Sequence, residues 1–186
     1  MPESGPPPAL VIERVVLLGY MTSGKSTVGQ ALARRLEWEF LDFDVEIERR
    51  EGRTVKEVIA AEGEEAFRER EAALTREAAE RPWVVLAPGG GWITRPELLD
   101  VLGSRTLSVW LRVSVDETVR RLRADDIDRP FRDHPDPASM IAAMLAQREP
   151  LYRLADLSTP AEGRSAEAIA FEIETVIRTR REVLIG

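Results

Sequence analysis

The residues best suited to chemistry begin with a glycine-rich segment that ends in lysine and serine. Gly19, Gly24, Lys25 and Ser26 have the spacing GxxxxGK[ST], which is typical of a phosphate-binding loop (P-loop). The glycines let successive backbone N–H groups point inward, and the helix that follows adds its positive end. Lys25 is expected to bridge the outer phosphates and Ser26 to bind Mg²⁺. The segment predicts the handling of nucleotide phosphates, with a plain glycine-rich turn as the alternative.

Two aspartates follow at the end of the next predicted strand. Asp42 and Asp44 are two residues apart, so on a regular strand both side chains point to the same face. One is expected to bind the magnesium, directly or through water, and the other to contact an acceptor hydroxyl, because a phosphoryl-transfer centre needs acidic side chains beside its P-loop. The alternative is that Asp44 caps the helix after it, and the two roles can coexist.

A glycine run and three arginines are further candidates. Gly89–Gly91 lack side chains just past a predicted strand, which favours close approach of a substrate, although a tight turn is the alternative. Arg68 and Arg148 lie in predicted helices, where an arginine can be a surface partner of glutamates or a favourable charge at a helix end. Arg129 is either a solvated loop residue or a mobile cation that stabilises charge during transfer. Periodicity does not decide between these roles.

The elements that must position these residues alternate between strand and helix. This alternation predicts an α/β fold in which helices cover both faces of a parallel sheet. Strands are predicted over 15–18, 39–44, 83–87, 106–111 and 156–159, and helices over 27–36, 45–50, 54–61, 64–80, 96–102, 115–123, 138–152 and 165–179.

The chain of 186 residues has the length of one domain. We expect that domain over 13–182, after a disordered arm over 1–12 that is rich in proline. The polar, proline-broken segment at about 124–137 is long for a connection in a compact domain, and it is predicted to be a functional lid.

Composition excludes several classes of protein. The net charge of −7 argues against nucleic-acid and acidic-membrane partners, so a bound phosphate must be held locally by loop amides and arginines. The absence of cysteine excludes disulfides and thiolate catalysis and indicates a reducing compartment, for which we expect the cytoplasm.

No stretch has the length of a membrane span, and Met1–Pro8 does not have the pattern of a secretory signal. His134 is expected in solvent, and a monomer is the expected state.

Six motifs in series resemble those of the shikimate kinases. Each motif after the P-loop is weak by itself, but their order and approximate spacing over about residues 14–178 are specific. The resemblance implies a three-layer P-loop kinase fold, with a five-stranded parallel sheet, helices on both faces and a mobile lid. It also implies transfer of the ATP γ-phosphate to a ring hydroxyl of shikimate, giving shikimate 3-phosphate and ADP, in aromatic amino acid biosynthesis. The motifs are GYMTSGKSTVG, LDFD, EGEEAFR, GGG, RP and QREPLY.

The resemblance also implies roles for individual residues. Catalysis would fall to Lys25, Asp44 and Arg129, with Asp44 as the candidate base, while Mg²⁺ would be bound by Ser26 with Asp42 nearby. Substrate binding would involve Asp44 at the hydroxyls, Arg68 and Arg148 at the carboxylate, and Gly89, Gly90 and Gly91 through the backbone. ATP would contact Thr22, Ser23, Gly24, Lys25, Ser26 and Thr27, together with Arg121, Arg129 from the lid and Arg164 near the adenine.

Some residues depart from the family pattern, and other functions compete. Pro88 and Trp92 flank the glycines where smaller residues are expected, and Phe131 replaces a leucine after Arg-Pro, so the acceptor could differ. The nearest alternative is a related kinase of another hydroxy acid such as gluconate. A GTP-dependent switch would need an Asn-Lys-x-Asp site, but the chain has no asparagine. A binding module without turnover is disfavoured by the intact Lys25 and Ser26.

Overall fold

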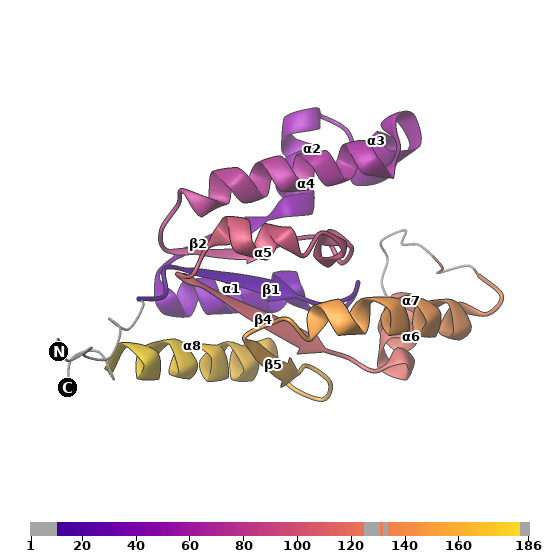
Figure 1. Ribbon diagram of the computed structural model, residues 1–186. Coiled ribbons are helices and arrows are strands. Elements are labelled where there is room, and N and C mark those ends of the chain that lie inside the picture. The colour runs from indigo at the N-terminus through magenta and orange to yellow at the C-terminus, as the bar shows by residue number, and fades with distance from the viewer. Residues whose placement is uncertain (1–10, 125–130, 132–133, 183–186) are drawn as a thin grey trace, which may run out of the picture.

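Five parallel strands form one sheet in the order β2-β3-β1-β4-β5 (Figure 1). The computed structural model describes residues 11–124, 131 and 134–182. In the register of the sheet, Val15 pairs with Val85 on one side and with Leu107 on the other. The central strand is buried on both faces because its residues are almost all apolar. The predicted five-stranded parallel sheet is confirmed, with strands β1 (Arg14–Leu18), β2 (Glu39–Asp42), β3 (Val84–Ala87), β4 (Thr106–Arg112) and β5 (Leu157–Pro160).

One face of the sheet is covered by α1 (Lys25–Leu36) and α8 (Ala166–Glu182), which pack against each other (Figure 1). Alternate residues of a strand point to opposite faces, and Val15 and Leu17 point to this one. Their partners include Leu32 of α1. This face therefore holds the helix whose first turn follows the P-loop.

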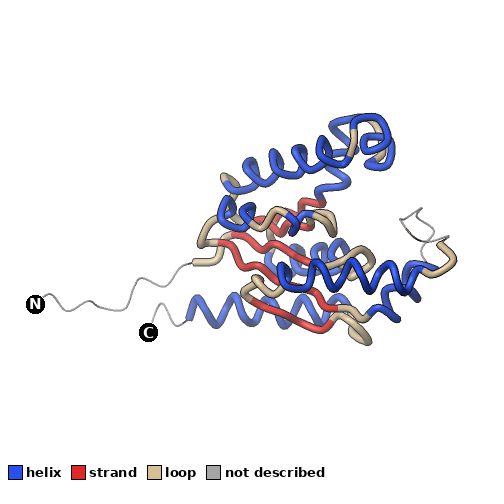
Figure 2. The backbone as a smooth tube through the Cα atoms, turned by 45° about the vertical axis from the view of Figure 1, so that its right-hand side comes forward, coloured by secondary structure: helices blue, strands red, loops and turns tan. Residues whose placement is uncertain are grey.

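The opposite face is covered by four helices, so that the strands lie between two helical layers (Figure 2). Val16 and Leu18 face this layer and belong to a core cluster with Phe43, Phe67 and Leu98. The helices are α2 (Phe43–Glu51), α3 (Val55–Glu62), α4 (Glu64–Ala79) and α5 (Glu97–Leu102), with a 3₁₀ turn, η1, at Trp92–Thr94 before α5. The three layers of the predicted fold are confirmed. None of the described helices is long and apolar enough to cross a membrane.

Two helices, α6 (Val115–Ala124) and α7 (Pro137–Tyr152), pack against each other beyond the carboxyl ends of the strands (Figure 1). Tyr20 of the P-loop is buried between them with Leu122 and Ile141. Most of the predicted lid, including Arg129, lies outside the described residues, as do residues 1–10 of the predicted arm. Within the rest of that arm, Ile12 is buried in the core.

The end of β2 differs from the prediction. The strand stops at Asp42 and α2 begins at Phe43, so Asp44 lies in the first turn of a helix. The prediction that Asp42 and Asp44 point to the same face of one regular strand is therefore wrong. The helix cap is Asp42, whose side chain accepts from the N–H groups of Asp44 and Val45. Both carboxylates still line one cavity, because the turn from strand to helix directs them there.

Candidate active site

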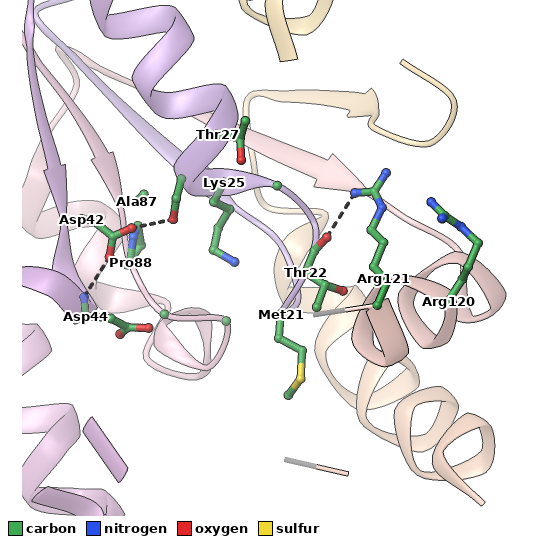
Figure 3. A pocket seen from close by; sticks show the side chains of 15 residues that line it. Met21, Thr22, Lys25, Thr27, Asp42, Asp44, Ala87, Pro88, Arg120 and Arg121 are labelled. Atoms are coloured by element: carbon green, nitrogen blue, oxygen red, sulfur yellow. Dashed lines mark hydrogen bonds between the residues drawn. The ribbon is translucent and has the colours of Figure 1, made fainter. Parts of the chain in front are cut away.

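A cavity of about 410 Å³ opens where β1, β2 and β3 end. In an open parallel sheet, this edge is where ligands bind, near the point at which the strand order reverses. Figure 3 shows Lys25 between two groups of side chains, Asp42 and Asp44 on one side and Thr22 and Arg121 on the other. The cavity is lined by Met21, Thr22, Gly24, Lys25, Ser26, Thr27, Asp42, Asp44, Ala87, Pro88, Gly89, Gly90, Arg120, Arg121 and Ala124.

The P-loop has the geometry of a phosphate cradle. Gly24 (φ 93°) is the N-cap of α1, so the first N–H groups of that helix face the cavity. Gly19 cannot carry a side chain, because a Cβ there would lie 2.9 Å from the carbonyl oxygen of Leu111. The hydroxyls of Thr22 and Ser23 are buried and have no hydrogen-bond partner among the described residues. Such groups suit a ligand that brings its own oxygen atoms, as a phosphate does.

Lys25 lies across this loop. Its Nζ donates to the carbonyl oxygens of Gly19 (2.8 Å) and Tyr20 (3.1 Å). These two carbonyl groups therefore hold the ammonium group over the concave side of the loop, which is the side that a phosphate would approach. The contact between Lys25 and the outer phosphates stays a prediction.

Ser26 and Asp42 form the polar floor of the cavity. The Ser26 hydroxyl donates to Oδ2 of Asp42 at 2.5 Å, while Oδ1 of Asp42 caps α2. A hydroxyl and a carboxylate are oxygen ligands of the kind that Mg²⁺ prefers, and Mg²⁺ keeps several waters or phosphate oxygens besides. The part of the chain that the structure describes has no cluster of three acidic or histidine side chains that could hold a metal. These residues fit a metal that arrives with a nucleotide.

On the acceptor side, Arg68 is fixed by a buried carboxylate that the sequence did not single out. Arg68 donates to Glu71 at 2.5 Å and to Glu64 at 2.7 Å, and the Gly89 N–H donates to the other oxygen of Glu71 at 3.1 Å. Burial raises the pKa of Glu71, which the Asp44 charge raises further and Arg68 opposes. A Cβ on Gly91 would collide with the guanidinium of Arg68. Glu71 therefore joins Arg68 to the glycine run.

Arg148 approaches the same run from α7. Its Nη1 donates to the Gly90 carbonyl at 3.3 Å, and the Tyr152 hydroxyl donates to the same oxygen at 2.7 Å. Gly90 also lies against the P-loop, since a Cβ there would be 3.0 Å from the Met21 nitrogen. The structure thus brings together Asp44, Arg68, Gly90 and Arg148, four residues that the family resemblance assigns to one acceptor site.

The remaining arginines differ in their relation to the cavity. Arg121 donates to the Thr22 carbonyl at 3.1 Å and to the Ala161 carbonyl at 2.9 Å, so it connects the P-loop to the segment after β5. Arg120 also lines the cavity, which the sequence did not indicate. Arg164 does not line it, because its guanidinium contacts Thr159 and Glu172 instead.

Trp92 differs from the expectation that it borders the acceptor. Its side chain is 1% exposed, and its indole N–H donates to the Thr75 hydroxyl at 2.9 Å. The ring therefore fills the core beneath α4, because the 3₁₀ turn directs it away from the cavity. Pro88 does line the cavity, as expected. His134 is exposed, as predicted.

Comparison with known proteins gives one consistent result. The family model described as "Shikimate kinase" matches residues 21–178. A shikimate kinase of Moorella thermoacetica is 41% identical over 170 residues, which cover 91% of this chain and 97% of that protein. A shikimate kinase of Halorhodospira halophila is 42% identical over 161 residues, covering 86% of this chain and 90% of that protein.

Solved structures give the same result. The shikimate kinase of Acinetobacter baumannii in complex with shikimate superposes with a TM-score of 0.83 at 36% identity, covering 90% of this chain and 94% of that one. A gluconokinase of Sinorhizobium meliloti superposes with a TM-score of 0.62 at 18% identity, covering 95% of this chain and 97% of that one. At that identity the likeness to the gluconokinase shows the fold alone.

Proposed function

The chain belongs to the shikimate kinase family, and from this premise we propose how its residues transfer the ATP γ-phosphate to a ring hydroxyl of shikimate. The products are shikimate 3-phosphate and ADP. One observation carries the proposal: Gly90 lies against the P-loop backbone on one side and accepts from Arg148 on the other. A phosphate donor and an anionic acceptor held by these two groups would therefore meet at the glycine run.

The nucleotide half rests on the P-loop. The backbone N–H groups at the start of α1 and the hydroxyls of Thr22 and Ser23 would bind the phosphates, with Lys25 at the outer ones. Arg121 is placed to support the loop through the Thr22 carbonyl. The contacts of Arg129 and Arg164 with ATP rest on the family resemblance.

Magnesium would be held by Ser26 and, directly or through water, by Asp42. Bound Mg²⁺ would neutralise negative charge on the β- and γ-phosphates during transfer. The short contact between Ser26 and Asp42 supports this assignment, because it aligns both oxygen atoms before any metal arrives.

The acceptor half rests on two guanidinium groups that approach the glycine run from α4 and α7. Each can bind a carboxylate through charge-assisted hydrogen bonds worth about 1.5–3 kcal/mol when water is excluded. Glu71 holds Arg68 in place, and the Gly90 segment limits how far Arg148 can move. The two arginines would thus fix the position of the acceptor's carboxylate, while the acceptor's hydroxyls are bound elsewhere in the site.

Asp44 would bind the acceptor hydroxyls from the first turn of α2. During transfer the hydroxyl oxygen bonds to the γ-phosphorus, the bond from that phosphorus to the bridging oxygen breaks, and ADP leaves. The proton of the hydroxyl passes to the Asp44 carboxylate as candidate base. Asp44 lines the cavity and lies near Glu71, so a negative acceptor must be held mainly by the arginines.

Lys25→Met tests the proposal, with Lys56→Met as the matched control. Lys56 is exposed on α3 and is the chain's other lysine. Loss of the ammonium that stabilises the transferred charge should lower kcat with ATP and shikimate by about 100- to 1,000-fold, while Lys56→Met stays near wild type. A coupled ADP-release assay measures both, and thermal melting checks that both variants fold. Retained turnover in folded Lys25→Met would contradict the P-loop assignment.

A further inference from the structure

The Gly90 carbonyl receives two hydrogen bonds from one helix. Tyr152 and Arg148 are four residues apart in α7 and therefore share a face of it. The bond from the Tyr152 hydroxyl is the shorter of the two, at 2.7 Å against 3.3 Å from Arg148. The tyrosine is thus the main partner of this carbonyl among the described residues.

Gly90 has little room to reorient. A Cβ placed on it would lie 3.0 Å from the Met21 nitrogen and 3.3 Å from the Tyr20 carbonyl carbon. The residue is confined by the P-loop backbone on one side and by α7 on the other. The two described donors to its carbonyl, Arg148 and Tyr152, both come from α7.

Tyr152 itself is rigidly held. Its side chain is 1% exposed, and its ring stacks on Trp110 of β4 with ring centres 5.6 Å apart and planes 15° apart. Burial raises the pKa of its phenol to about 12, so the hydroxyl keeps its proton at neutral pH and remains a donor. Arg148, by contrast, is half-buried, and its guanidinium lies over the Tyr20 ring at 5.6 Å.

We propose that Tyr152 is a positioning residue for the acceptor, which satisfies the Gly90 carbonyl and so leaves the Arg148 guanidinium available to the acceptor's carboxylate. This inference rests on the proposed function. Without the hydroxyl, Arg148 would be the sole described donor to a confined carbonyl. A bound carboxylate would then compete with Gly90 for the same N–H groups, and the acceptor would bind more weakly.

Tyr152→Phe removes the hydroxyl and keeps the stacked ring. We expect the KM for shikimate and its Kd by calorimetry to rise about three- to tenfold, which corresponds to the net effect of one hydrogen bond. The KM for ATP and kcat should stay within about twofold. The matched control is Thr118→Val on α6, which removes another buried hydroxyl that donates to a backbone carbonyl at 2.8 Å. We expect Thr118→Val to lose about as much thermal stability as Tyr152→Phe but to leave the Kd for shikimate unchanged.

A double-mutant cycle with Arg148→Lys tests whether Tyr152 acts through Arg148. If it does, Tyr152→Phe changes the Kd for shikimate much less in the Arg148→Lys background than in the wild type. Additive effects, an unchanged Kd in Tyr152→Phe, or an equal rise in the KM for ATP would each overturn the inference. A wild-type protein that transfers no phosphate to shikimate would instead overturn the proposed function, and the inference with it.

Discussion

Asp42 has two roles at the end of β2. One carboxylate oxygen caps α2, and the other accepts from the Ser26 hydroxyl. The first role concerns folding stability and the second the proposed metal site. A single substitution can separate them, because asparagine caps helices about as well as aspartate but lacks the charge.

We predict that Asp42→Asn melts close to the wild-type temperature. Its activity at limiting Mg²⁺ should fall by about 10- to 100-fold, because the carboxylate that would hold Mg²⁺, directly or through water, is lost. A Mg²⁺ titration of the kinase rate, run beside a thermal melt, measures both properties. An unchanged Mg²⁺ dependence would contradict the metal assignment, whereas a large drop in melting temperature would mean that the charge serves folding.

Single residues also show where prediction from sequence succeeds. The P-loop can be predicted from the sequence because Gly19, Gly24 and Lys25 lie within a few residues of one another and form the loop together. Glu71 was not readable, since one more glutamate in a helix rich in charge gives no signal until the fold buries it against Gly89. Arg68 and Arg148 were assigned by family resemblance and not by periodicity.

At the scale of elements, α2, α3 and α4 are joined by a ring of ion pairs. Arg70 of α4 binds Glu51 and Glu62 at 2.6 Å each, and Arg53 binds the same two carboxylates at 2.9 and 2.6 Å. Hydrogen bonds from Arg70 and Arg53 lower the pKa of Glu51 from 4.5 to about 2. Because the folded-state pKa is the lower one, this stabilisation is complete above about pH 4.5 and is lost as the pH falls toward 2.

Arg70→Gln should therefore lower the melting temperature by a few degrees at pH 7 and by much less near pH 2. It should also weaken the dependence of stability on salt, since ion pairs that are partly exposed to solvent are screened. Arg76→Gln, at an exposed arginine of the same helix, is the control. Melting curves between pH 2 and 8 measure the effect, and an equal loss at every pH would show that the ring contributes through packing alone.

Element boundaries were predictable where local chemistry sets them. The Thr54 side chain caps α3 by accepting from the Glu57 N–H, and the Thr54 N–H donates in return to the Glu57 carboxylate. The end of β2 was not predictable, because the aromatic and acidic residues of 39–44 suit either a strand or the start of a helix. The paired neighbour decides it, since β3 ends at Ala87, opposite Asp42.

At the scale of the whole molecule, an acidic chain must bind two anionic substrates. The net charge of −7 gives no general attraction for phosphate or carboxylate groups. The fold instead provides positive charge locally, because the carboxyl ends of β1, β2 and β3 bring helix N–H groups, Lys25 and arginines to one cavity. The strand alternation predicted the parallel sheet, but which arginines meet at its edge depends on the packing of α4, α6 and α7.

A comparison of acceptors tests the central claim most directly. Coupled ADP release from wild-type protein with Mg²⁺ and ATP should be compared for shikimate, gluconate and nucleoside monophosphates. We predict that kcat/KM for shikimate exceeds that for each other acceptor by at least about 100-fold, because only shikimate presents a carboxylate and ring hydroxyls at the spacing that Arg68, Arg148 and Asp44 define. A higher kcat/KM for gluconate or a nucleotide, or ADP release independent of any acceptor, would contradict the account.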